Sequence, residues 1–195
     1  MNVLFPNISL PSTIWLPAVN VGYTDENGHT YNYAILTSGD YTVADCSNVY
    51  IGSNAVVRLK VTGSVNQSGN NVLRIASGGS LKLYMMGTSF KLAGNGAVNG
   101  SGLANDNGNA ASFYYFGLAS NTSIDFHGNA SFTGAVYAPN ADFQLGGGGN
   151  NTYDFVGASV TKSVKMNGKF NFHYDENLRR NNMGRGYIPT SWKES

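Results

Sequence analysis

Charge, cysteine and long apolar runs are all scarce in this chain. Asp, Glu, Lys and Arg make up 12% of its 195 residues, and the formal net charge is +1. No basic stripe is present, so nucleic acid is not expected as a partner. The single cysteine, Cys46, excludes an internal disulfide and predicts a lone buried thiol. No stretch reaches the roughly 18 apolar residues of a membrane span, and residues 1–10 lack the pattern of a signal peptide.

Glycine and strand-forming residues are what the chain has instead. It contains 25 glycines, and 42% of its residues are hydrophobic. Glycine tolerates left-handed backbone and therefore marks tight turns, whereas Val, Tyr, Phe and Thr favour strands. The composition predicts an all-β chain of many short strands with enough apolar surface for one core.

An internal repeat is the most informative pattern. In three segments a glycine is followed by apolar residues seven and nine positions later and by a second glycine at position eleven. The segments are Gly52–Gly63, Gly117–Gly128 and Gly157–Gly168. From Gly117 to Gly134 the spacing is 17 residues. From Gly134 to Gly157 it is 23, which includes the six-residue Gly/Asn run 146–151. The sequence therefore predicts a structural unit of about 17 residues.

A unit of this size cannot bury its own apolar face, but it can do so by stacking on the next copy. We therefore expect a single-stranded parallel β-helix, or solenoid. Residues 1–35 would form an extended lead-in or linker with a hairpin near Asp25–Gly28, residues 36–175 the solenoid, and residues 176–195 a short helical cap that begins after Asp175. A β-sandwich with accidental spacing is the alternative.

Strand alternation assigns side chains to the two faces of each rung. Phe126, Phe143 and Met166 each lie nine residues after a glycine and are predicted to form one inward column. A second inward column would hold Ile124, Ala141 and Val164. Asp125, Asp142 and Lys165 would then face solvent.

Several motifs in the second half of the chain resemble a known family. They are Gly134, the run Tyr137-Ala138-Pro139-Asn140-Ala141, the glycine run, Gly157-Ala158, Asn167-Gly168, the segment His173 to Leu178 and the terminal Ser191 to Glu194. With these features the chain resembles an uncharacterised bacterial β-solenoid domain that occurs C-terminally in PilX-like, type IV pilus-associated and other exported surface proteins. The resemblance implies an extracellular or cell-surface location, with an export signal upstream of residue 1. It implies no activity.

Three residues are the candidate binding residues. Asp125 and Asp142 lie one predicted period apart and would stack about 5 Å apart on adjacent rungs. Such paired carboxylates, with Asp154 nearby, are the kind of group that carbohydrate-active β-helix enzymes use. Tyr114, in the aromatic run 113–116, would stack on a sugar ring if its face were exposed. Solvated polar positions and ordinary rung packing explain the same residues without a ligand.

Other chemistry has less support. His173, Tyr174, Asp175 and Glu176 form the most catalytic-looking cluster, but a packed His173 and a helix cap from Asp175 explain it structurally. The glycine run lacks the Lys-Ser/Thr of a phosphate loop, and the three histidines have no zinc-ligand spacing. We therefore expect no catalytic residue, no metal and no cofactor.

The sequence favours a non-catalytic structural or adhesive module of a bacterial surface or pilus-associated protein. Its expected partners are a surface polysaccharide or other pilus or envelope proteins. Two alternatives stay open: a carbohydrate-active β-helix enzyme, that is, a polysaccharide lyase or hydrolase, and a self-assembling scaffold similar to bactofilins.

Overall fold

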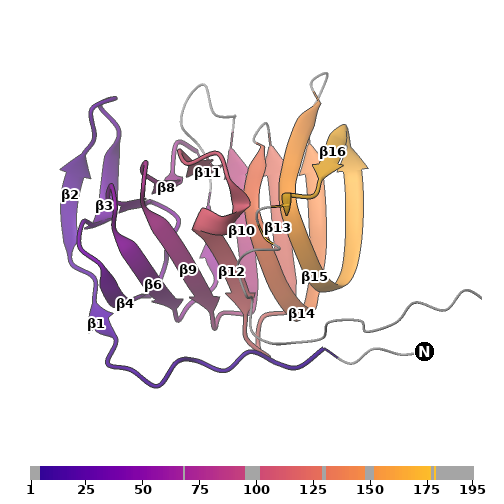
Figure 1. The fold of residues 1–195 in the computed structure, drawn as a ribbon, viewed down its shortest axis with the longest axis horizontal. Coiled ribbons are helices and arrows are strands. Elements are labelled where there is room, and N and C mark those ends of the chain that lie inside the picture. The colour runs from indigo at the N-terminus through magenta and orange to yellow at the C-terminus, as the bar shows by residue number, and fades with distance from the viewer. Residues whose placement is uncertain are drawn as a thin grey trace, which may run out of the picture.

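The computed structural model describes residues 5–67, 69–94, 102–128, 131–147, 152–176 and 178. These residues form two sheets and, besides strands, one short 3-10 helix (Figure 1). The all-β class predicted from the composition is confirmed. The first sheet contains β1 (Leu16–Pro17), β4 (Gly39–Val43), β6 (Val56–Val61), β7 (Val65–Asn66), β9 (Ser80–Met85), β10 (Ser89–Gly94), β12 (Phe113–Gly117), β13 (Ser123–Gly128), β14 (Phe132–Gly147), β15 (Tyr153–Gly168) and β16 (Phe170–His173). The second contains β2 (Asn20–Thr24), β3 (Thr30–Ile35), β5 (Val49–Ile51), β8 (Val72–Ile75) and β11 (Gly102–Asn105). The helix is η2 (Ala110–Ser112).

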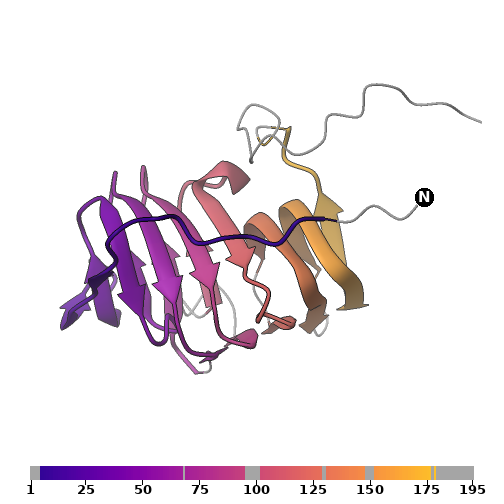
Figure 2. The same cartoon turned by 90° about the horizontal axis from the view of Figure 1, so that it is seen from below.

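Nearly all strand pairs are parallel. In the eleven-stranded sheet every pairing is parallel, and in the five-stranded sheet only β2 and β3 run antiparallel. The long strand β14 pairs with β12 through its first half and with β13 through its second half. The sheet therefore curls around the core, and Figures 1 and 2 show its strands stacked side by side along the long axis. This arrangement is consistent with a β-helix-like fold.

The spacing between paired residues varies along the stack. The expected 17 residues separate Phe155 from its partner Phe172. The other steps are longer: Tyr41 pairs with Leu59, Leu59 with Leu83, Leu83 with Tyr115, Tyr115 with Val136 and Val136 with Ser159. The prediction of a uniform period is therefore wrong for most of the stack, because the connections between strands differ in length.

The predicted inward column is wrong in its partners and right in its direction. Across β13, β14 and β15, Ile124 pairs with Phe143 and then Val164, whereas Phe126 pairs with Leu145 and then Met166. The corner before Ser123 is two residues longer than the corner before its partner Asp142, so the register moves by two. A shift of two leaves the inside and outside faces unchanged. Phe126 and Phe143 are accordingly both buried, and their rings meet diagonally with centroids 5.4 Å apart.

Phenylalanine rings form a ladder inside the stack. The ring centroids of Phe126 and Phe132, of Phe132 and Phe155, and of Phe155 and Phe172 lie 4.8, 4.8 and 4.7 Å apart, each pair stacked. These spacings match the distance between neighbouring strands. We name this set the phenylalanine ladder. Its first three rings are buried, while Phe172 at the end of the stack is 47% exposed.

The N-terminal region contains the predicted hairpin, in which β2 and β3 flank a turn at Asp25–Gly28. Before it, residues 5–15 cross the stack lengthwise (Figure 2). At one end of this segment the Tyr137 hydroxyl donates to the carbonyl of Pro6 at 2.8 Å. At the other end Thr13 donates to Asp40 at 2.6 Å. We call residues 5–15 the N-terminal strap.

The predicted role of Asp175 needs correction. Its carboxylate accepts a hydrogen bond of 2.8 Å from the backbone N–H of Ala110, the first residue of η2. Asp175 thus caps a helix that lies 65 residues earlier in the chain. Of the predicted helix after Asp175, residue 177 and residues 179 onward lie outside the described residues.

Candidate functional site

The outward side chains of β10, β13 and the second halves of β14 and β15 form a mixed polar surface. The strand register arranges them in rows: Ser89, Ser123, Asp142 and Ser163 in the first, and Lys91, Asp125, Gln144 and Lys165 in the second, with His127 beyond. We call this set the polar face. It contains two of the three candidate residues, Asp125 and Asp142, and alternation places both outward as predicted.

Asp125 and His127 form an ion pair on the polar face. They lie two positions apart on β13 and therefore point to the same side, and the carboxylate Oδ1 contacts the imidazole Nδ1. Both contacting atoms are buried, although the side chains are 25% and 39% exposed. The imidazole lies beside Gly146 of β14, where an added β-carbon would come within 3.0 Å of Nε2. The glycine therefore leaves room for the ring. The Asp-x-His spacing was visible in the sequence, but we had examined the histidines only as metal ligands.

Asp142 does not face Asp125, which corrects the expected carboxylate pair. Asp142 lies across from Ser123, and Asp125 lies across from Gln144, so the two carboxylates are diagonal neighbours at most. Asp142 turns instead toward β15. It accepts a hydrogen bond of 2.7 Å from the Ser163 hydroxyl and lies 3.5 Å from the Lys162 ammonium. The Ser163 hydrogen bond, together with the Lys162 charge, lowers the pKa of Asp142.

Tyr114 is buried, so the expectation of an exposed ring is wrong. Its side chain is 7% exposed and packs in a small cluster with Ala110, Ala135 and Leu178. Leu178 follows the last strand, and this return of the chain covers an outward face that alternation alone leaves open. Tyr114 therefore has no face for stacking on a sugar, and the candidate binding surface reduces to the polar face.

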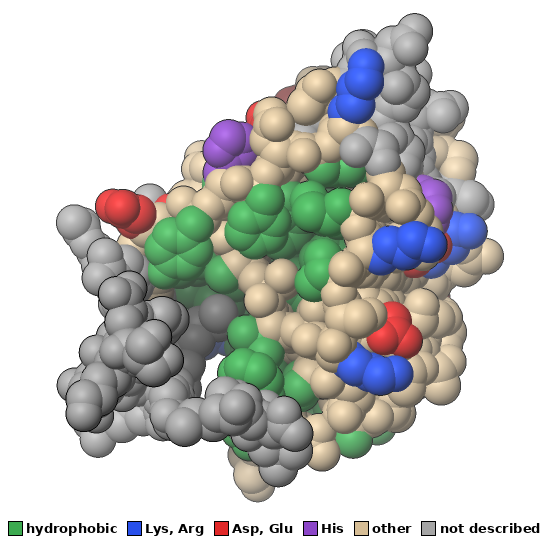
Figure 3. Space-filling model, turned by 90° about the vertical axis from the view of Figure 1, so that its right-hand side faces the viewer, with side chains coloured by type: hydrophobic (Ala, Val, Ile, Leu, Met, Phe, Trp, Pro, Cys, Tyr) green, Lys and Arg blue, Asp and Glu red, His purple; other side chains and the backbone are tan. Residues whose placement is uncertain are grey.

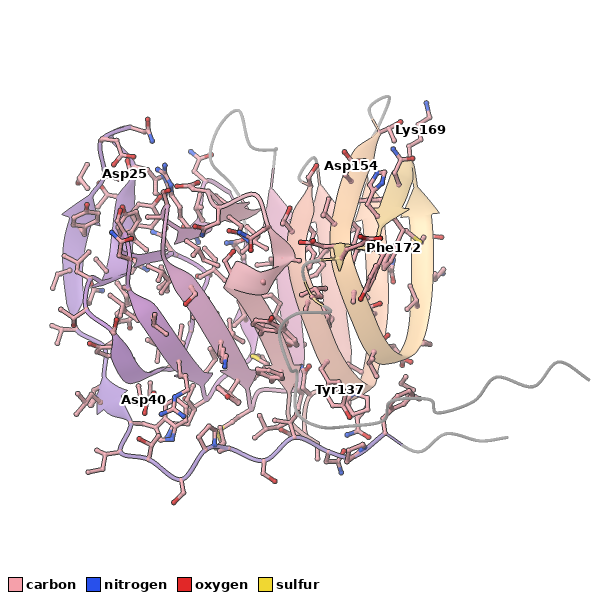
Figure 4. The ribbon with its side chains drawn as sticks, viewed as in Figure 1. Asp25, Asp40, Tyr137, Asp154, Lys169 and Phe172 are labelled. Atoms are coloured by element: carbon pink, nitrogen blue, oxygen red, sulfur yellow. The ribbon has the colours of Figure 1, made fainter. Side chains whose placement is uncertain are left out.

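The cluster around His173 divides between two tasks. Asp154 of β15 accepts a hydrogen bond of 3.1 Å from the Asn171 amide, and His173 Nε2 lies 3.1 Å from the same oxygen (Figure 4). Asp175 caps η2, and Tyr174 is 54% exposed. These residues join the last strand to its neighbours, in agreement with the structural interpretation.

A second charged cluster was missed by sequence reasoning. Arg74 of β8 contacts three carboxylates: Asp25 at 2.6 Å, Asp106 at 2.8 Å and Glu26 at 3.3 Å. The Asp25 side chain is 1% exposed and also accepts a 3.0 Å hydrogen bond from Tyr31. Burial alone would raise the pKa of Asp25, but hydrogen bonds from His29 N–H, Tyr31, Asn27 N–H and Arg74 hold it below its ordinary value. The Arg74 cluster ties the hairpin to the second sheet across 49 residues of chain.

Neither cluster is arranged for a metal, and within the described residues no group of three or more His, Cys, Asp or Glu side chains could hold one. The described part of the chain also contains no helix with the length and hydropathy needed to cross a bilayer. The polar face thus offers hydroxyl, amide, carboxylate, imidazole and ammonium groups on a surface supported by strands. Such a surface can form hydrogen bonds with a polar ligand.

Comparison with known proteins gives a family and no activity. Searches of curated proteins and of solved structures found no match. Residues 20–181 match a family described as "Domain of unknown function (DUF7305)". The match runs from the first strand of the hairpin past the last described residue and thus includes both the polar face and the Arg74 cluster. This chain therefore belongs to the DUF7305 family.

Proposed function

We propose that this chain is a non-catalytic structural or adhesive module, in which a β-solenoid serves as a rigid spacer on a bacterial surface or pilus-associated protein. The phenylalanine ladder is the observation that carries the proposal. Stacked rings at strand spacing fix each rung on the next, and parallel pairing continues along the whole described stack. A body built in this way keeps its length and holds its loops at defined separations.

The polar face supports the adhesive part of the proposal. Asp125, His127 and Gln144 present acceptors and donors from adjacent strands, and Lys91 and Lys165 lie on the strands at either side of them. Sugar hydroxyls require groups of this kind. Lysines beside the site favour acidic over neutral polysaccharides, so an anionic surface polysaccharide is the ligand class we propose.

Binding and turnover on a panel of neutral and anionic polysaccharides test this proposal. We expect binding of an anionic member without release of reducing ends or unsaturated sugars. Asp125→Asn and Lys165→Gln should each weaken binding by about tenfold or less, as expected for exposed polar contacts. Lys60→Gln, on the other outward side of the stack, is the matched control and should bind normally. Wild-type protein that binds no member of the panel would leave the spacer role and remove the adhesive one.

A carbohydrate-active β-helix enzyme is the second candidate, because the Asp125–His127 pair resembles an acid–base unit. Its expected second carboxylate, Asp142, is engaged by Ser163 and Lys162, which weakens this alternative. Turnover that is lost in both Asp125→Asn and His127→Gln would establish the enzyme and overturn the non-catalytic proposal.

The surface location has its own test. Fractionation of the producing cells, followed by antibody detection of the native protein, should place it in the extracellular or surface fraction. Protease added to intact cells should degrade it there. Recovery only from the cytoplasmic fraction would contradict the proposed location without affecting the fold.

A further inference from the structure

The C-terminal end of the stack exposes core-type side chains. Val164, Met166 and Phe172 have the inward direction of the buried residues before them, yet they are 51%, 42% and 47% exposed. Each belongs to the last described strand on its side of the stack, so no further described strand covers it. Figure 3 shows hydrophobic side chains gathered on this end, and Figure 4 places Phe172 there. We call this surface the C-terminal end.

The N-terminal end of the stack also exposes apolar side chains. Leu16 of β1, Val19, and Val21 of β2 are 54%, 70% and 58% exposed. Within the described residues, β1 pairs only with β4 and β2 only with β3, so each is an edge strand. Unpaired edges of this kind favour pairing with another chain. We call this surface the N-terminal end.

The two ends carry opposite charge. Residues 1–57 contain four carboxylates, Asp25, Glu26, Asp40 and Asp45, and no lysine or arginine. Residues 157–195 contain seven basic and three acidic residues. On the C-terminal end, Lys162, Lys165 and Lys169 are exposed, and Figure 3 shows basic side chains beside the apolar ones.

We propose that the C-terminal end of one molecule binds the N-terminal end of a second copy, so that the chain assembles head to tail. Apolar contact between Met166 or Phe172 and Val19 or Val21 would supply the association. The opposite charges would select the direction. This inference rests on the two ends alone and does not depend on the proposed location or on the polysaccharide.

Like-with-like contacts are disfavoured by the same charges. A tail-to-tail dimer would bring Lys162, Lys165 and Lys169 against their own copies, and lysines on an edge strand discourage such pairing. A head-to-head dimer would bring Glu26 and Asp45 against the same carboxylates. Only the mixed contact places the basic end beside the acidic end. Because its rotation need not close, such a contact generates a growing chain of copies.

Analytical ultracentrifugation of the full chain tests the assembly. At low salt the weight-average mass should rise with protein concentration, and added salt should lower it because it screens the opposite charges. Met166→Glu and Val21→Glu should each weaken association by at least about tenfold, as apolar residues at the centre of an interface do. Lys165→Glu should weaken it as well while leaving the apolar surface intact. Val56→Glu is the control, since Val56 is 62% exposed but lies away from both ends.

Mixing the two blocked variants establishes the direction. The Met166→Glu protein keeps its N-terminal end, and the Val21→Glu protein keeps its C-terminal end. Each alone should be monomeric, and an equimolar mixture should form dimers that grow no further. If Val21→Glu alone dimerises, the contact is tail to tail; if Met166→Glu alone dimerises, it is head to head. Either result, or a wild-type monomer at every concentration, overturns the proposal.

Discussion

Gly157 faces the carbonyl oxygen of Gly134 across strands β15 and β14 so closely that a β-carbon at residue 157 would overlap that oxygen. The backbone φ of Gly157 is 149°, which side chains rarely tolerate. Two neighbouring rungs therefore meet here through bare backbone. The contact explains why both repeat units carry a glycine at this position.

Gly157→Ala should consequently destabilise the fold by more than about 3 kcal/mol, because it adds steric overlap to an unfavourable φ. Thermal unfolding followed by circular dichroism would measure the loss. Gly146→Ala is the matched control, since the obstacle there is the edge of the His127 ring at 3.0 Å and not backbone. A similar loss in the two variants would show that backbone contact is not what distinguishes Gly157.

Phe126→Ala should cost about 3–5 kcal/mol, the usual cost of truncating a buried aromatic residue. Phe126 is 8% exposed and stacks on Phe132 in the phenylalanine ladder. Asp125→Ala, one residue away on the polar face, should cost less than about 1 kcal/mol because its ion pair is partly solvated. Chemical denaturation gives both values. Equally mild effects would contradict the assignment of inside and outside on β13.

The Arg74 cluster should make stability depend on pH in the acid range. The pKa of Asp25 is lower in the folded chain than its ordinary value of about 3.9. Ionised Asp25 thus stabilises the fold fully above that value, and the contribution is lost as the pH falls below it through the folded-state pKa. Unfolding free energies measured between pH 2.5 and 7 should decline below about pH 4. Asp25→Asn should flatten that decline.

Arg74→Ala examines the same cluster from the cationic side. Removal of the guanidinium leaves Asp25, which is 1% exposed, as a buried charge without its cation. The expected cost is about 3–5 kcal/mol at neutral pH. Arg58→Ala is the comparison, because Arg58 pairs with Asp40 but is itself 38% exposed. Equal losses from the two substitutions would show that burial of Asp25 adds nothing.

Cys46 should be unreactive in the folded chain. Its side chain is 0% exposed, and burial, aided by the nearby Asp45 charge, raises the pKa of the thiol. Reagents that attack thiolates should therefore leave it unmodified in native buffer and modify one thiol per chain in denaturant. Stoichiometric modification without denaturant would contradict the burial of this residue.

The sequence predicted direction better than partnership. Alternation placed Phe126 and Phe143 inside and Asp125 and Asp142 outside, because the two faces of a strand follow from local geometry. The partners of these residues depend on how many residues each corner uses. The corner before Ser123 is two residues longer than the corner before Asp142, and no glycine spacing revealed that difference. The expected pairing of Asp125 with Asp142 failed for this reason.

Long-range contacts account for the other errors. Tyr114 was expected to be exposed because its strand alternates, yet Leu178 lies on it from a segment 64 residues later in the chain. Arg74 attracted no attention as an isolated arginine, because its carboxylates come from the hairpin and from Asp106. A pattern within one segment cannot reveal a partner that another segment supplies.

The N-terminal strap imposes an order of events on synthesis. The hydroxyl of Tyr137 and the amide of Asn140 bind Pro6 and Asn7 across 131 and 133 residues of chain. The strap leaves the ribosome first, yet these partners do not exist until more than two thirds of the protein has been made. At about 5–20 residues per second, that interval lasts roughly 7 to 26 s. The earliest part of the chain is therefore among the last to reach its native place, and it locks the strands lengthwise only after β14 has formed.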